Sequence, residues 1–126
     1  MSGEAAITAA NAFQDAFNAL NSSGMADACN FPHVRLAKGA FTRFETREDF
    51  LKTHASMKER LKAEGWDHTT MESIKVVHEG PDKVHLAIEN SRRHADGTVY
   101  KPFNTFWIIT LQDGHWGIQF RSSYLT

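Results

Sequence analysis

The chain has 126 residues, a length that fits a single domain with one hydrophobic core and argues against two domains. Its 14 Lys and Arg nearly balance 15 Asp and Glu, so the formal net charge of −1 argues against nucleic acid or an anionic membrane as the main partner. Hydrophobic residues make up 41% of the chain, which excludes a natively disordered protein.

Cys29 is the only cysteine, so the chain can form neither an internal disulfide nor a thiolate cluster for zinc, and we expect a reducing, cytoplasmic location. The first residues, Met1 to Glu4, lack the basic flank and the apolar stretch of a signal peptide. The longest apolar run, residues 103–111, has the length of a strand, so we expect no membrane span.

The first predicted element is an amphipathic helix over residues 4–20, because alanines and phenylalanines recur at helical spacing with Asn, Gln and Asp on the other side. A short second helix is expected at residues 25–29, before Pro32. A short hairpin then joins residues 33–37 to 41–45, with Val34 and Leu36 on one face and His33 and Arg35 on the other.

A long helix is predicted from Thr46 to about Glu64, because Thr46 and Asp49 have the spacing of a capping box. Its apolar stripe contains one histidine, His54.

From Trp66 onward the apolar pattern has period two and is interrupted by turns at 79–82, 96–97 and 113–114, which predicts a meander of four antiparallel strands. The two Asp-Gly pairs suit two-residue hairpins, so Ala95 should oppose Thr98 and Gln112 should oppose His115.

This register gives the sheet one apolar face and one mixed face. The apolar face, which should meet the helices, holds Val84, Leu86, Ile88, Asn90, Phe103, Thr105, Trp107, Ile109, Leu111, Trp116, Ile118, Phe120, Ser122 and Tyr124. The mixed face carries the large apolar side chains Phe106 and Ile108. Because their exposure to water is unfavourable, this face is a candidate homodimer interface.

The order helix, short helix, hairpin, long helix and C-terminal meander, ending in Asp113-Gly114-His115-Trp116-Gly117-Ile118, resembles the nuclear transport factor 2-like superfamily, and most closely its branch akin to SnoaL-type polyketide cyclases. The resemblance covers almost the whole chain. It implies that residues 1–126 form one domain. It implies an α+β fold: a cone-shaped α+β barrel with helices packed on a strongly curved antiparallel, or mixed, sheet. It also implies a cone-shaped pocket, homodimers, and members that are isomerases, dehydratases, cyclases, epoxide hydrolases or non-catalytic binders.

The ketosteroid isomerase branch of that superfamily needs a tyrosine on the first helix and acids on the first and the penultimate strands. The matching positions here are Phe13, Leu36 or Ala37, and Asn104, none of which can supply that chemistry. The hairpin register also places Asn104 on the mixed face. Catalysis of the ketosteroid isomerase type is therefore not expected.

His54 is the candidate catalytic residue, because a partly buried imidazole directed at the pocket can act as acid or base near neutral pH. The competing interpretation, which we favour, is a core histidine satisfied by a backbone carbonyl or water. A hydroxyl from Ser122 or Tyr124 could assist an enzyme.

The candidate ligand-binding residues are aromatic side chains with interspersed polar ones, although aromatic side chains also dominate ordinary cores. They are Phe13, Phe17, Asn90, Thr105, Trp107, Trp116, Phe120, Ser122 and Tyr124.

Two charged features are interpreted as structural. Glu89 and Arg121 should form a surface or interface ion pair on the mixed face, and Arg92-Arg93-His94 should be a solvated strand end. No metal-binding motif and no phosphate-binding loop occurs, so neither a metal nor another cofactor is predicted.

Three functions remain open. The first is binding of a small apolar or amphipathic molecule in the pocket of a cytoplasmic homodimer. The second is a cofactor-free isomerase, dehydratase or cyclase that uses His54. The third is a protein-interaction module that works through the outer sheet face.

Overall fold

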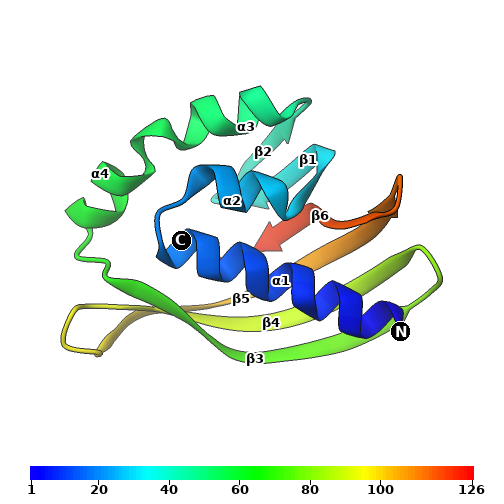
Figure 1. Ribbon diagram of the computed structural model, residues 1–126. Helices are drawn as coiled ribbons and strands as arrows, with labels where there is room; N and C mark the ends of the chain where they lie inside the picture. Colours follow the sequence, from blue (N-terminus) through cyan, green and yellow to red (C-terminus); the bar gives the residue numbers. More distant parts are fainter.

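The computed structural model describes all residues, 1–126, as a curved six-stranded sheet with helices on its concave side (Figure 1). The helices are α1 (Ser2–Asn18), α2 (Ser22–Asp27), α3 (Arg47–Thr53) and α4 (Met57–Ala63), with a 3₁₀ turn at His54–Ser56. The strands are β1 (Cys29–Ala37), β2 (Ala40–Phe44), β3 (His68–Glu79), β4 (Lys83–Arg93), β5 (Val99–Gln112) and β6 (His115–Ser123). The predicted α+β class and the element order are confirmed.

The strand order is β2-β1-β6-β5-β4-β3, so the predicted meander of β3 to β6 is continued by the hairpin of β1 and β2. Strands β1 and β6 run parallel, whereas every other pair is antiparallel, which makes the sheet mixed. No helix is long and apolar enough to cross a membrane.

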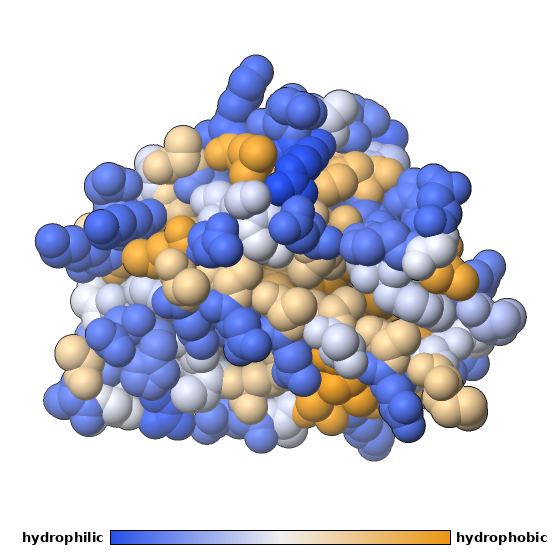
Figure 2. Space-filling view, viewed as in Figure 1, coloured by the Kyte–Doolittle hydropathy of each residue, from blue (hydrophilic) through white to orange (hydrophobic).

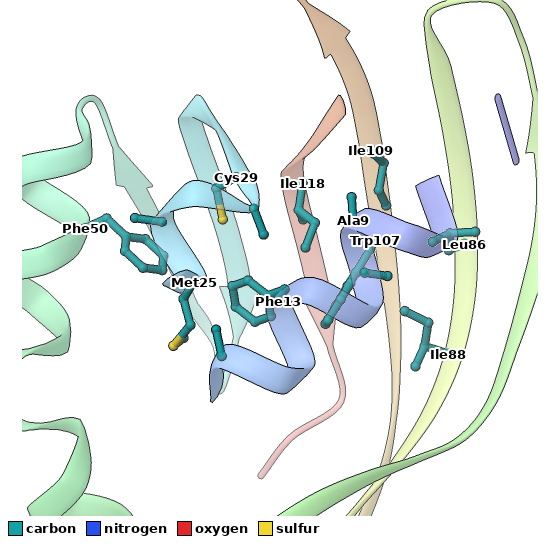
Figure 3. Packing of buried hydrophobic residues seen from close by; sticks show 14 of the residues in the cluster. Ala9, Phe13, Met25, Cys29, Phe50, Leu86, Ile88, Trp107, Ile109 and Ile118 are labelled. Carbon is teal, nitrogen blue, oxygen red and sulfur yellow. The ribbon is translucent and has the colours of Figure 1, made fainter. Parts of the chain in front are cut away.

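Hydrophobic side chains of α1 and of the concave sheet face form the core. Figure 3 shows Phe13 of α1 directed toward Trp107 of β5, and their rings meet edge to face at 5.3 Å. Val84, Leu86 and Ile88 of β4 are buried beside Ile109 and Ile118, as the apolar alternation predicts. In the view of Figure 2, hydrophilic residues cover most of the surface and hydrophobic ones show chiefly in a band across the middle.

The hairpin between β5 and β6 begins in the predicted register, because Gln112 pairs with His115 and both Asp113 and Gly114 have positive φ, 52° and 78°. The loop between β4 and β5 is longer than predicted. His94 N–H donates to the Thr98 carbonyl, and the register shifts next to Arg92. From Arg92 opposite Lys101 onward, the predicted pairing holds.

The predicted continuous helix over 46–64 is wrong in its middle. Thr46 caps α3 by accepting a hydrogen bond from the Asp49 N–H, as expected. The 3₁₀ turn at His54–Ser56 then separates α3 from α4. The interruption lets the two short helices wrap over the open end of the curved sheet (Figure 1).

Candidate functional site

A cavity of about 240 Å³ lies between the helices and the concave face of the sheet. Phe13 and Phe17 of α1, Phe44 of β2 and Trp107 of β5 contribute aromatic walls. Residues of α3, the 3₁₀ turn and α4 complete the lining on the helical side, among them His54 and Leu61.

Six of the residues predicted for the site lie together around this cavity. They are Phe13, Phe17, His54, Asn90, Thr105 and Trp107. Trp116 packs against the core away from the cavity, near α1 and α2.

The structure does not place Phe120, Ser122 or Tyr124 at the cavity: the first two lie on the outer face of β6, and Tyr124, just after β6, is 77% exposed. A β-bulge causes the difference: Ile109 pairs with Ile118, but Ile108 pairs with Phe120, so Gln119 is an extra residue in β6. Every later residue of β6 changes face. Ser123, rather than Ser122, therefore lines the cavity.

The bulge also brings Arg121 into the cavity lining, opposite Trp107 of β5. The predicted ion pair between Arg121 and Glu89 is accordingly wrong. Glu89 stays on the outer face, where it accepts a hydrogen bond from Ser73 (2.9 Å), and Arg121 is only 8% exposed.

The polar atoms of Thr105 and Trp107 are already occupied within the protein. The indole N–H of Trp107 donates to the Thr105 hydroxyl (2.9 Å), which also lies 2.6 Å from the Ser123 hydroxyl. Asn90 differs, because it is 4% exposed and its side-chain oxygen is buried without a hydrogen-bond partner. Asn90 is thus a neutral side chain in the cavity with unused hydrogen-bonding capacity.

His54 lies at the start of the 3₁₀ turn, stacked on the ring of Phe50 with centroids 4.1 Å apart. Its Nδ1 donates to the Phe50 carbonyl (2.9 Å), whereas its Nε2 has no protein partner. Burial lowers the pKa of His54 to about 4, and the positive charges of Arg121, Arg60 and Arg35 act in the same direction. The imidazole is therefore neutral at pH 7 and can accept a proton or a hydrogen bond at Nε2.

His33, which is fully buried, holds Arg121 in place. Its Nδ1 donates to the Ile118 carbonyl (2.8 Å), and its Nε2 accepts a hydrogen bond from Nε of Arg121 (3.0 Å). Burial lowers the pKa of His33 to about 3, and the charge of Arg121 reinforces that shift. The guanidinium of Arg121 also lies 4.9 Å from the ring centroid of Phe13.

The interpretation of residues 92–94 as a solvated strand end is wrong for Arg92, which is 9% exposed and lines the cavity. Arg92 donates to Glu64 of the α4 end (2.8 Å), and Tyr100 donates to the same carboxylate oxygen (2.6 Å). Burial alone would raise the pKa of Glu64, but these two hydrogen bonds and the charge of Arg92 outweigh it, so that the pKa is lowered. Glu64 is thus ionised and paired.

The sequence reasoning missed Arg35, Arg60, Arg92 and Arg121 as cavity residues. For Arg35 a pattern was available, because the period-two alternation already placed it beside His33 on the face opposite Val34. Nowhere in the structure do three or more His, Cys, Asp or Glu side chains come together in a way that could hold a metal ion.

A curved mixed sheet with helices enclosing a cavity on its concave face defines the class of NTF2-like proteins. The chain matches the model of the NTF2-like protein family DUF6841 over residues 4–123, and it belongs to this family. The resemblance noted in the sequence is thereby confirmed. No curated protein matches the sequence.

Solved structures share the fold at low sequence identity. An NTF2-like protein with a cystatin-like fold from Novosphingobium aromaticivorans has a TM-score of 0.79 at 14% identity, covering 98% of this chain and 81% of that one. An NTF2-like protein of unknown function from Shewanella oneidensis has a TM-score of 0.71 at 13% identity, covering 98% and 99%. A ketosteroid isomerase-like protein from Erwinia carotovora atroseptica has a TM-score of 0.68 at 18% identity, covering 97% and 94%. These likenesses establish the fold alone.

Proposed function

We propose that this protein binds a small, mostly apolar molecule in the cavity between its helices and its sheet. The observation that carries the proposal is an open volume of about 240 Å³ among aromatic side chains that a packed core would otherwise bring into contact. Because drug-sized ligand pockets usually measure about 300–1,000 Å³, the volume favours a compact ligand.

Neighbouring serines on opposite faces of β6 provide a matched test. Ser123→Phe should fill the cavity, whereas Ser122→Phe adds the same bulk on the outer face. Naphthalene derivatives, neutral and anionic, serve as probes, with binding followed by calorimetry. The proposal expects the wild type and Ser122→Phe to bind at least one probe and Ser123→Phe to bind none. A wild type that binds none of them, or a Ser123→Phe variant that binds normally, would contradict it.

We propose a second function, supported by one observation at His54: the protein is a cofactor-free isomerase, dehydratase or cyclase in which this residue removes a proton. The neutral imidazole has a donor bond at Nδ1 and an Nε2 lone pair without a protein partner in the cavity lining. A pKa of about 4 keeps the imidazole in its unprotonated, proton-accepting form at neutral pH. The expected readout is exchange of an activated C–H of a bound ligand for deuterium, followed by NMR in heavy water. His54→Gln should abolish the exchange and keep the binding.

We also propose that the outer sheet face joins two copies of the chain. Phe41 is 67% exposed on this face and pairs with Leu36, and Phe120 and Ile108 lie on the same face two and three strands away. An apolar area of this kind on a sheet favours association. The third possibility, an interaction module for another protein, uses the same face and predicts a monomer that binds a different chain.

A further inference from the structure

The cavity is lined by positive charge far in excess of negative charge. Five cations line it, namely Arg35, Lys38, Arg60, Arg92 and Arg121, against one acid, Glu64. In the whole chain acids outnumber Lys and Arg, 15 to 14, so the excess is local to the cavity. Glu64 is already paired with Arg92, which leaves four cations that form no salt bridge.

Arg121 is the deepest of the four and has spare hydrogen-bonding capacity. Its Nε is bound by His33, but no protein atom accepts from its terminal nitrogens, and Nη2 is completely buried. A buried guanidinium without a partner anion is unfavourable, so proteins rarely keep one without a reason.

No group of the protein neutralises Arg121. The neighbouring Cys29 thiol is uncharged, because burial raises its pKa to about 12. His33 is neutral, and Arg121 itself stays protonated at pH 7, since burial lowers its pKa only to about 10. The charge of Arg121 is therefore left without a balancing acid in the protein.

A second arginine lies opposite the first on the neighbouring strand. Arg35 of β1 pairs in register with Arg121 of β6, so both side chains leave the same face of adjacent strands. Like charges at such positions repel one another, and no acid separates them. Each guanidinium carries several N–H donors, and two such groups on one face of the sheet suit a planar anion with two oxygen atoms.

The remaining cations lie closer to solvent. Arg35 is half-buried, whereas Lys38 in the turn after β1 and Arg60 on α4 are exposed. The positive lining therefore runs from the rim of the cavity inward to Arg121. Such an arrangement attracts anions and guides them into a low-dielectric site.

We propose that the ligand of this cavity is an organic carboxylate whose two oxygen atoms are bound by Arg121 and Arg35 and whose apolar body lies among Phe13, Phe44 and Trp107. The inference rests on the proposed binding function and names its ligand class. Asn90 supplies a neutral polar contact for a second group on the ligand.

The first experiment compares 1-naphthoate with 1-naphthamide, which has nearly the same shape but no charge. By calorimetry at low salt, the wild type should bind the carboxylate about 10- to 100-fold more tightly. Arg121→Met should lose this preference and keep the affinity for the amide. Arg43→Met is the matched control, because Arg43 lies on β2 outside the cavity and is paired with Glu45. Arg43→Met should retain the preference.

A second measurement needs no apolar body. Formate, compared with chloride at equal ionic strength, should raise the thermal midpoint of the wild type and of Arg43→Met but not that of Arg121→Met. Equal affinity for naphthoate and naphthamide, or an equal response of Arg121→Met and wild type to formate, would overturn the carboxylate inference while leaving the binding function intact. Failure of both naphthalene probes together with a formate effect that depends on Arg121 would retain the anion site and overturn the apolar-ligand function.

Discussion

Nε of Arg121 donates a hydrogen bond of 3.0 Å to Nε2 of His33, whose Nδ1 is committed to the Ile118 carbonyl. The two hydrogen bonds together fix the tautomer of His33. Arginine can only donate, so Nε2 is unprotonated and the ring proton is on Nδ1. His33 thus positions Arg121 without sharing its charge, and the terminal nitrogens of the guanidinium are left without a protein acceptor.

Replacement of His33 by leucine should destabilise the protein. The change leaves Nε of Arg121 and the Ile118 carbonyl without their partner inside the core, which costs about 1–3 kcal/mol for each unsatisfied group. Urea denaturation measures the loss of unfolding free energy. The matched control is His78→Leu on the exposed edge strand β3, where a change below about 0.5 kcal/mol is expected. Similar values for the two variants would contradict the role of His33.

Arg121→Met should stabilise the ligand-free protein, in contrast to most substitutions of buried residues. Removal of a buried charge that lacks a partner anion, with a side chain of similar length in its place, should raise the unfolding free energy by about 1–4 kcal/mol and outweigh the lost hydrogen bond to His33. Thermal and urea denaturation without ligand test this expectation, with Arg43→Met as the surface control. A clear loss of stability in Arg121→Met would show that the charge is compensated within the protein.

Acid should destabilise the protein below pH 6.5 because of two histidines. The pKa values of His33 and His54 are lowered from 6.5 to about 3 and about 4, so between these values and 6.5 the unfolded chain binds protons that the folded chain does not. Stability is therefore complete above pH 6.5 and falls as the pH falls through this window. In urea titrations at successive pH values, His54→Gln should show a shallower fall than the wild type between pH 6.5 and 4. An identical slope would mean that His54 is not shielded from water.

Disruption of the outer face should separate the proposed homodimer. Phe120→Glu places a carboxylate opposite Ile108 in the middle of that face, where burial against a second copy would be unfavourable. Sedimentation velocity should give a dimer for the wild type and for Lys58→Glu, a control on the exposed side of α4, and a monomer for Phe120→Glu. A monomeric wild type would favour the interaction module instead.

Local patterns were sufficient to predict most of the fold. The Asp113-Gly114 turn fixed the start of the last hairpin, and the apolar alternation of β4 and β5 identified which face is buried. The Thr46 cap located the start of α3. Each of these features depends on residues close together in the sequence, and this is why sequence reasoning could find them.

The centre of the site depends on contacts between distant residues. Large apolar side chains occupy every second position at Trp116, Ile118 and Phe120. Nothing local therefore indicates that Gln119 is an extra residue in the strand. Gln119 is held by Thr110 of the neighbouring strand and by Pro32, and Arg121 by His33 and Phe13. Apart from Thr110, these partners lie far away in the chain. The cationic character of the cavity follows from these contacts and could not be predicted from period-two patterning.

The bulge in β6 determines which residues at the end of that strand face the cavity. Within the last strand, the residues at 121 and 123 face the cavity and those at 120 and 122 face outward, and a single extra position upstream decides which pair goes where. If Gln119 took a regular place in the ladder instead of forming the bulge, Phe120 would face the cavity and Arg121 the outer face. The same sequence of β6 would thus give the cavity an aromatic side chain in place of a guanidinium if the ladder were regular.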